Sequence, residues 1–192
     1  DKDGYADLVL VGEWMPIKVF KNRKGKSFED VSNALGFANT EGWWTKIEID
    51  DLDGDGDIDF LLGNAGKNLQ YHASKNEPIE YHIQDINNDG GPDAIMSYYI
   101  QGKSYPAPSL DELTEQVTGL RKKYYKYEDY ADATVKDIMG SDLFASAKKL
   151  KIVTLESSWA ENDGNGKFIV KQLPDAAQVS MVNAFVGIDL DG

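Results

Sequence analysis

The chain has 192 residues, of which 41% are hydrophobic, a composition typical of a globular protein rather than a disordered one. Its formal net charge of −13 argues against nucleic acid or an anionic membrane surface as a partner. The sequence has no cysteine, which excludes disulfides, and no apolar run long enough to cross a bilayer.

The chain opens on an acidic segment, Asp1-Lys2-Asp3-Gly4-Tyr5-Ala6-Asp7, and the apolar run Leu8-Val9-Leu10-Val11-Gly12 after it predicts a strand. A different pattern occurs twice, in residues 20–28 and 160–168. In each copy an asparagine precedes a phenylalanine by six positions, with a glycine-containing turn between them. These two segments therefore predict equivalent hairpins.

A complete acidic motif spans residues 51–59, where aspartates at alternate positions are separated by Leu, Gly, Gly and Ile. Two like charges about 4 Å apart repel by about 1 kcal/mol in water and about 4 kcal/mol near a protein surface. Calcium takes oxygen ligands from such closely spaced carboxylates. We predict side-chain ligands at Asp51, Asp53, Asp55 and Asp59, a backbone ligand at the Asp57 carbonyl, and a turn at Gly56. The alternative is a solvated acidic turn.

The flanks of this motif indicate strands. Residues 44–49 alternate polar and apolar side chains, and the apolar run 60–63 is too short for a helix. An EF-hand would need a glutamate at position 12 and helices on both sides, but position 12 is Leu62.

Two further copies of the motif follow. Residues 85–93 predict a second site with one charge fewer, and residues 94–100 predict its exit strand. Its ligands would be Asp85, Asn87, Asp89, Gly91 through its carbonyl, and Asp93. The last copy contains only the front of the motif, with Asp189 and Asp191, whereas the N-terminus contains the rear, with Asp1, Asp3 and Asp7. We expect the C-terminal strand to pair with the N-terminal one, in the same chain or a neighbour, and so rebuild a third calcium loop.

Between residues 108 and 150 the pattern changes to that of helices. Ser109 with Glu112 has the form of a capping box, and apolar residues recur at helical spacing up to Tyr124. A second helix is predicted from about Glu128 to Met139, closed by Gly140. Ser141 or Asp142 is expected to cap a third helix through Lys149, and strand pattern resumes at 150–155.

A strand, a calcium loop of this kind and a second strand resemble the FG-GAP repeat, also called VCBS repeat, of integrin-α-like propellers. Segments 97–106, 120–123 and 130–134 resemble a subgroup of secreted or surface FG-GAP proteins of Bacteroidetes. The resemblance implies a β-propeller fold, structural calcium and an extracytoplasmic location, whether secreted, periplasmic or at the outer-membrane surface. It names no ligand.

Other residues allow competing interpretations. His72 and His82 suit acid–base or zinc chemistry, but neither lies in a spaced metal motif, and a structural role is favoured. Residues 121–127 interleave basic and aromatic side chains, which suits nucleic acid less well than a protein-binding surface on so acidic a chain. Tryptophans at 14, 43, 44 and 159 suit blade cores or sugar stacking.

The sequence therefore predicts an all-β dominated fold, a partial β-propeller with an inserted α-helical subdomain. The expected domains are blades at 1–107, a helical insertion at 108–150 and continuing blade strands at 151–192. The expected function is non-catalytic binding or scaffolding of a protein or glycan, with self-association through unpaired blade edges. The alternative is an accessory or catalytic part of a polysaccharide-acting enzyme, whose carboxylate pair would lie among the aspartates.

Overall fold

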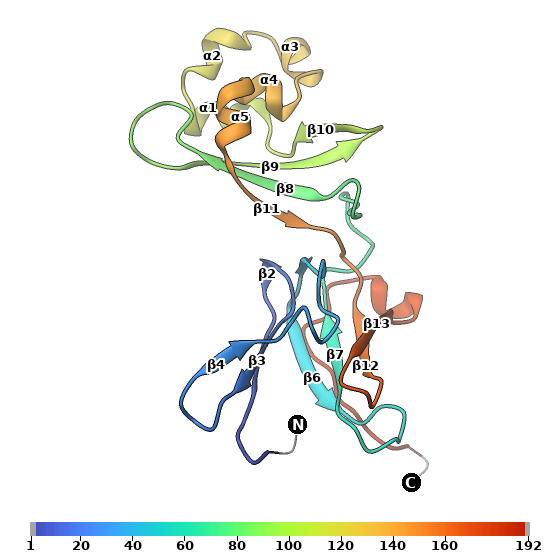
Figure 1. Ribbon diagram of the computed structural model, residues 1–192. Helices are drawn as coiled ribbons and strands as arrows, with labels where there is room; N and C mark the ends of the chain where they lie inside the picture. Colours follow the sequence, from blue (N-terminus) through green and yellow to red (C-terminus); the bar gives the residue numbers. More distant parts are fainter. Residues whose placement is uncertain (1–2, 191–192) are drawn as a thin grey trace. The chain divides into compact units, whose positions relative to one another are not determined.

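The computed structural model describes residues 3–190 (Figure 1). The chain divides into two compact units, one of residues 1–70 with 152–192 and the other of residues 71–151. Their regular structure is mostly antiparallel sheet, as predicted, although residues 3–190 show no closed propeller. The predicted boundaries after residues 107 and 150 fall inside the second unit.

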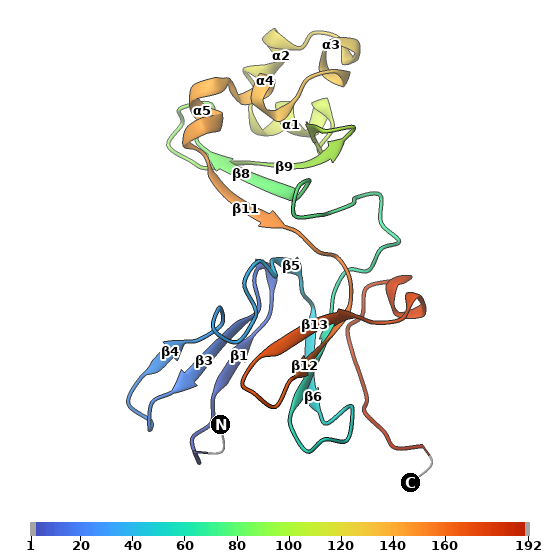
Figure 2. The same cartoon turned by 45° about the vertical axis from the view of Figure 1, so that its right-hand side comes forward.

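The first unit contains two larger sheets and a short ribbon (Figure 2). A three-stranded sheet has the order β1-β3-β4, with β1 at Leu8–Leu10, β3 at Lys18–Asn22 and β4 at Phe28–Asp30. A four-stranded sheet has the order β13-β12-β7-β6, with bounds Lys46–Asp50 (β6), Asp59–Gly63 (β7), Ser158–Asn162 (β12) and Phe168–Gln172 (β13). The ribbon pairs β2 (Glu13–Met15) with β5 (Gly42–Trp43), and the 3₁₀ helix η1 spans Asp175–Gln178.

The two larger sheets repeat one register. Leu8 pairs with Phe20 in the first, and Phe60 pairs with Ala160 in the second. The hairpins also match, because Asn22 lies opposite Phe28 as Asn162 lies opposite Phe168. The predicted equivalence of residues 20–28 and 160–168 is therefore confirmed. Strands β7 and β12 are neighbours although the whole second unit comes between them in sequence.

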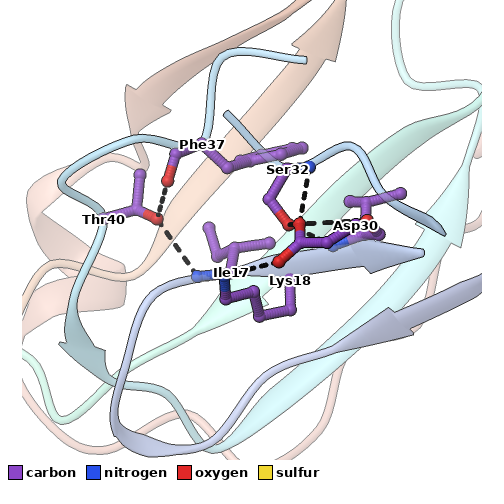
Figure 3. A network of polar contacts seen from close by, with 7 residues as sticks. Ile17, Lys18, Asp30, Ser32, Phe37 and Thr40 are labelled. Atoms are coloured by element: carbon purple, nitrogen blue, oxygen red, sulfur yellow. Dashed lines mark hydrogen bonds and ion pairs between the residues drawn. The ribbon is translucent and has the colours of Figure 1, made fainter. Parts of the chain in front are cut away.

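A hydrophobic core lies between these two sheets. It combines Ile17 and Val19 with Phe37, Trp44, Phe60, Leu62 and Ala160. Polar contacts hold the connection from β4 to β5 against this core (Figure 3). Thr40 Oγ1 accepts a hydrogen bond from the Ile17 N–H at 3.1 Å and donates to the Phe37 carbonyl at 2.7 Å. Ser32 Oγ accepts from the Val19 N–H at 2.9 Å, so both buried hydroxyls satisfy backbone groups that the sheet leaves unpaired.

The second unit has its own sheet and core. Its sheet has the order β10-β9-β8-β11, with bounds Ile79–Gln84 (β8), Asp93–Ile100 (β9), Lys103–Pro106 (β10) and Lys148–Ile152 (β11). Five short helices connect β10 to β11: α1 (Leu110–Gln116), α2 (Leu120–Lys123), α3 (Tyr127–Ala131), α4 (Val135–Met139) and α5 (Ser141–Ser146). Buried side chains of α1, α2 and α4 pack with Ile95 of β9, which makes this unit a compact body.

The helices differ from the prediction in their lengths and caps. The capping box of Ser109 and Glu112 is present, and Gly140 ends α4 at a φ of 81°. The helix predicted at about 128–139 is instead two helices, because Thr134 takes an extended conformation and forms a second capping box with Asp137. The expectation that Ser141 or Asp142 caps the next helix is wrong, since Gly140 is the N-cap, and that helix ends at Ser146 rather than Lys149.

Candidate metal centre

The loop that joins β6 to β7 folds around the carboxylate of Asp51. Asp51 Oδ1 accepts hydrogen bonds from the N–H groups of Gly54 and Asp55 at 2.9 and 3.1 Å. Asp51 Oδ2 accepts from the N–H of Gly56 at 2.9 Å. The turn requires φ of 78° at Gly54 and 87° at Gly56, values at which a residue with a Cβ is strained. The glycines at positions 4 and 6 of the motif thus let the chain curl around its first aspartate.

Asp59 closes the loop from the other side. Its Oδ2 accepts from the Leu52 N–H at 3.1 Å, and its Oδ1 accepts from the Asn162 N–H of β12 at 2.8 Å. Only 1% of Asp59 is exposed, so this carboxylate is fixed by the sheet rather than by solvent.

Three of the predicted side-chain ligands come together. Ligand oxygens of Asp51, Asp53 and Asp59 all lie within 4.8 Å of one another, and two of these residues are exposed. Three carboxylates at this distance repel one another, and an oxygen-seeking cation removes that repulsion. Asp55 and Asp57 lie outside this group: Asp55 Oδ1 accepts from the Asp57 N–H at 2.8 Å. The roles of Asp55 and Asp57 as ligands stay predictions. The carboxylates of Asp51, Asp53 and Asp59 form a donor set that fits a hard divalent ion.

The N-terminal half motif has the same local geometry as the rear of loop 51–59. Asp3 Oδ1 accepts from the Tyr5 N–H at 2.9 Å, as Asp55 does from Asp57. Asp7 Oδ1 accepts from the Asn22 N–H at 2.8 Å, as Asp59 does from Asn162. The predicted ligands Asp1 and Asp191 lie outside the described residues, and Asp189 is exposed.

A comparison with known protein families finds a repeat in the part of the chain that contains the N-terminal half motif and the 51–59 loop. Residues 1–62 match the FG-GAP-like repeat. The matched stretch contains the half motif, the three-stranded sheet, β6, the whole 51–59 loop and most of β7. No curated protein and no solved structure matches the chain.

The loop at residues 85–93 lies outside the matched FG-GAP-like repeat but repeats five of the hydrogen bonds of loop 51–59. Asp85 takes the place of Asp51, since its Oδ1 and Oδ2 accept from the N–H groups of Asp89 and Gly90 at 3.1 and 3.0 Å. Asp93 takes the place of Asp59, since its Oδ2 accepts from the Ile86 N–H at 2.8 Å. Asn88 adopts φ 58° where the first loop has Gly54, a conformation that asparagine tolerates better than most residues.

Positions 3 to 7 of this second loop also correspond to the first. Asn87 Oδ1 accepts from the Asp89 N–H at 2.9 Å, and Asp89 Oδ1 accepts from the Gly91 N–H at 2.8 Å. The Asn87 amide in addition donates to Asp89 Oδ2 at 2.9 Å, a contact that an aspartate cannot make. Gly91 has its predicted place at position 7, where only its carbonyl can serve as a ligand. Sequence and local geometry therefore define a second candidate site, with one carboxylate fewer.

The histidines take no part in these loops. His72 is exposed, whereas His82 is fully buried on β8, where its Nε2 lies 3.0 Å from Ser97 Oγ. Burial, with a smaller contribution from the Lys149 charge, lowers the pKa of His82 to about 4, so it is neutral at pH 7. This agrees with a structural role for His82.

Sequence reasoning missed one pair of residues at the site. In the sequence Asn22 and Asn162 mark the two equivalent hairpins, and in the structure each donates its backbone N–H to the last aspartate of an acidic segment. Their side chains also donate to the loop backbone, Asn22 to the Ala6 carbonyl and Asn162 to the Ile58 carbonyl. The asparagine six residues before a phenylalanine was the available signal for this role.

Proposed function

We propose that the chain is a calcium-stabilised, β-propeller-like module that binds a protein or glycan partner outside the cytoplasm. The main support is the shared geometry of loops 51–59 and 85–93, in which the same five hydrogen bonds recur in two places. The FG-GAP-like repeat in residues 1–62 supports the propeller-like and extracytoplasmic part of the proposal. We also propose that the chain belongs with the secreted or surface FG-GAP proteins of Bacteroidetes that segments 97–106, 120–123 and 130–134 resemble.

Calcium has a structural role in this proposal. The ion would lie among the carboxylates of Asp51, Asp53 and Asp59, with Asp55 and the Asp57 carbonyl completing its shell. Because Asp59 also accepts from Asn162 of β12, an ion there would strengthen the link between the β6–β7 hairpin and the next strand of the sheet. Carboxylates occupied in this way are poor proton donors, which supports a non-catalytic module.

Calorimetric titration of the metal-stripped chain tests this function. We expect calcium binding at two sites of different affinity and a higher melting temperature with calcium than with excess chelator. Magnesium at the same concentration is the control, since it favours a smaller, octahedral site and keeps its water ligands. A melting temperature that is the same in calcium and in chelator would contradict the proposal.

The alternative, a part of a polysaccharide-acting enzyme, has one observation in its favour. The second unit contains a pocket of about 290 Å³ that is lined by three tyrosines together with Gln101 and Lys103. Tyr98 and Tyr105 lie directly opposite each other on β9 and β10, and Tyr130 comes from α3. Aromatic faces beside an amide and an ammonium group suit a sugar ring. A glycan array probed with the wild type and with Tyr105→Ala separates a glycan partner from a protein partner.

No helix in residues 3–190 is long and apolar enough to span a membrane.

A further inference from the structure

The hairpin of β9 and β10 gathers pocket residues on one of its faces. Tyr98 pairs with Tyr105, and Ile100 pairs with Lys103. Because side chains alternate along a strand, all four lie on the same face of the hairpin. Directly opposed residues of an antiparallel pair have Cβ atoms about 4.5–5.5 Å apart, so the two tyrosines lie side by side. The hairpin thus supplies one wall of the pocket of about 290 Å³ in the second unit, and α3 supplies another.

The three tyrosines of this pocket are held to different degrees. The Tyr130 hydroxyl donates to the Pro108 carbonyl at 2.6 Å, and the Tyr98 ring packs edge-on against Tyr71 with ring centroids 5.1 Å apart. Neither Pro108 nor Tyr71 lines the pocket, so these two rings are fixed from outside it. Within the described chain no ring contact includes Tyr105. The half-buried Tyr105 ring is therefore the face on which a ligand can stack.

The turn of this hairpin is strained at a residue that lines the pocket. Gln101 and Gly102 have φ of 50° and 78°, and a two-residue type I′ turn requires positive φ at both positions. Asparagine, aspartate or glycine is usual at the first position, since a longer side chain tolerates this conformation poorly. Gln101 nevertheless stands there and lines the pocket. Such backbone strain gathers where a side chain serves a function, which here is to extend an amide into the pocket.

The charge of the pocket is opposite to that of the chain. The protein has a formal net charge of −13, but Lys103 is the one charged residue among the described residues that line the pocket. None of the ion pairs of the described chain includes Lys103. An unpaired ammonium group beside aromatic rings attracts an anionic group of a ligand. Glycosidases use a pair of carboxylates, which this lining lacks, so the pocket fits sugar binding rather than cleavage.

We propose that this pocket binds one sugar unit that bears a carboxylate or a sulfate. The sugar ring stacks on Tyr105, the Lys103 ammonium pairs with the anionic group, and the Gln101 amide bonds with ring hydroxyls. The volume of about 290 Å³ lies just below the usual range for ligand pockets, roughly 300–1,000 Å³, which suits one unit of a longer glycan. This inference deepens the proposed function and rests on it for a glycan partner, whose class and site it names.

A titration followed by NMR tests the recognition of charge. The full chain in calcium is titrated with the methyl glycosides of glucose, of glucuronic acid, and of glucose sulfated at its primary hydroxyl. We expect at least one charged glycoside to bind several-fold more tightly than methyl glucoside, and the two charged probes separate carboxylate from sulfate. Lys103→Gln should reduce this affinity to that of methyl glucoside and leave the neutral sugar unaffected. Lys148→Gln is the matched control, because Lys148 is exposed on β11 at the opposite edge of the sheet, and it should bind like the wild type.

Gln101→Asn separates a role in binding from a role in the turn. Asparagine suits positive φ but carries an amide that is one methylene shorter. We expect an equal or higher melting temperature and a several-fold lower affinity for the charged glycoside. Tyr105→Ala should weaken all three glycosides, with its melting curve as the check on folding. Wild-type affinity in Gln101→Asn would contradict the role of that amide.

Three results would overturn the proposal. They are no binding of any glycoside by the folded wild type, equal binding of charged and neutral glycosides, and charged-glycoside binding that Lys103→Gln leaves unchanged, because the sugar would then bind elsewhere. A chain that calcium stabilises but that binds no glycoside contradicts this inference alone. A chain that binds the charged glycoside but melts at the same temperature in calcium and in chelator contradicts only the role of calcium in the proposed function.

Discussion

Asp59 Oδ1 accepts a hydrogen bond of 2.8 Å from the backbone N–H of Asn162, which lies 103 residues further along the chain. Asp7 and Asn22 repeat this contact at the same length across 15 residues. The last aspartate of the motif thus connects its loop to the next strand of the sheet, whatever the length of chain between them. The same carboxylate belongs to the candidate metal group, so an ion bound as proposed would be coupled to the stability of the sheet through one side chain.

Asp59→Asn is expected to destabilise the first unit even without metal. Both oxygens of Asp59 accept backbone N–H groups in a buried place, and an asparagine would point its NH₂ at one of these donors. The cost should be about 1–3 kcal/mol of unfolding free energy, measured by urea denaturation in excess chelator. Asp53→Asn is the matched control, because Asp53 is exposed and an asparagine keeps the oxygen that accepts from the Asp55 N–H. Equal losses in the two variants would contradict the structural role of Asp59.

Exchanging the residues at position 3 should exchange the properties of the two loops. We expect Asp53→Asn to weaken calcium binding at 51–59 and Asn87→Asp to strengthen it at 85–93, because each changes one carboxylate at a position that makes the same backbone hydrogen bond in both loops. Asn87→Asp should also destabilise the metal-free protein, since it replaces the Asn87–Asp89 hydrogen bond with repulsion between two carboxylates. Titration calorimetry gives the two affinities. An Asn87→Asp protein with unchanged affinity would show that the second loop does not bind calcium through this position.

Much of the fold could be predicted because the signals were local. Alternation at residues 44–49, the glycines at positions 4 and 6 of the loop and the asparagine–phenylalanine spacing each depend on a few neighbouring residues. The pairing of β7 with β12 across the second unit could not be predicted in this way, since neither strand indicates its partner. Similarly, the contact between Asp59 and Asn162 requires the sheet to exist first.

The helices show where local reasoning fails. The apolar residues from Leu110 to Tyr124 have helical spacing and are all buried, but the helix breaks between Gln116 and Leu120. Helical spacing reports which side chains face the core, and it does not report whether the backbone turns continuously between them. The break at Thr134 has a local signal in the sequence, because a threonine three residues before Asp137 has the form of a capping box even within an apolar pattern.

Thr134→Ala tests the capping box that divides this region. Thr134 Oγ1 accepts from the Asp137 N–H at 3.2 Å, and Asp137 Oδ2 accepts from the Thr134 N–H at 3.0 Å. Loss of a threonine cap should lower the stability of the second unit by about 0.5–2 kcal/mol. The Thr134 hydroxyl also donates to Asp137 Oδ2 at 2.6 Å. This bond first, and then the one from the Thr134 N–H, lower the pKa of Asp137, so loss of the hydroxyl should return that pKa toward its usual value in an NMR titration. Thr118→Ala, at an exposed threonine outside the caps, is the control; an equal effect there would contradict the capping role.

The second unit should lose stability in mild acid because of its buried histidine, His82. His82 is fully buried against Ser97 and the Phe144 ring, and Glu80 Oε2 lies 3.5 Å from its Nε2. Desolvation lowers the pKa of His82, and the positive charge of Lys149 lowers it further. Its pKa falls from 6.5 to about 4 in the folded chain, so between these values the unfolded chain binds more protons. Stability contributed by neutral His82 is therefore complete above pH 6.5 and decreases as the pH falls toward 4.

His82→Gln removes this titration and keeps a polar side chain near Ser97 Oγ. We expect the variant to be less stable than the wild type at pH 7.5 but to lose less unfolding free energy between pH 7.5 and pH 5, measured by urea denaturation in chelator. His72→Gln is the matched control, since His72 is exposed, and it should follow the wild-type dependence. Acidic residues titrate mainly below this window and contribute alike to all three proteins. If the wild type and His82→Gln lost the same free energy over this range, a buried neutral His82 would be the wrong description of the second unit.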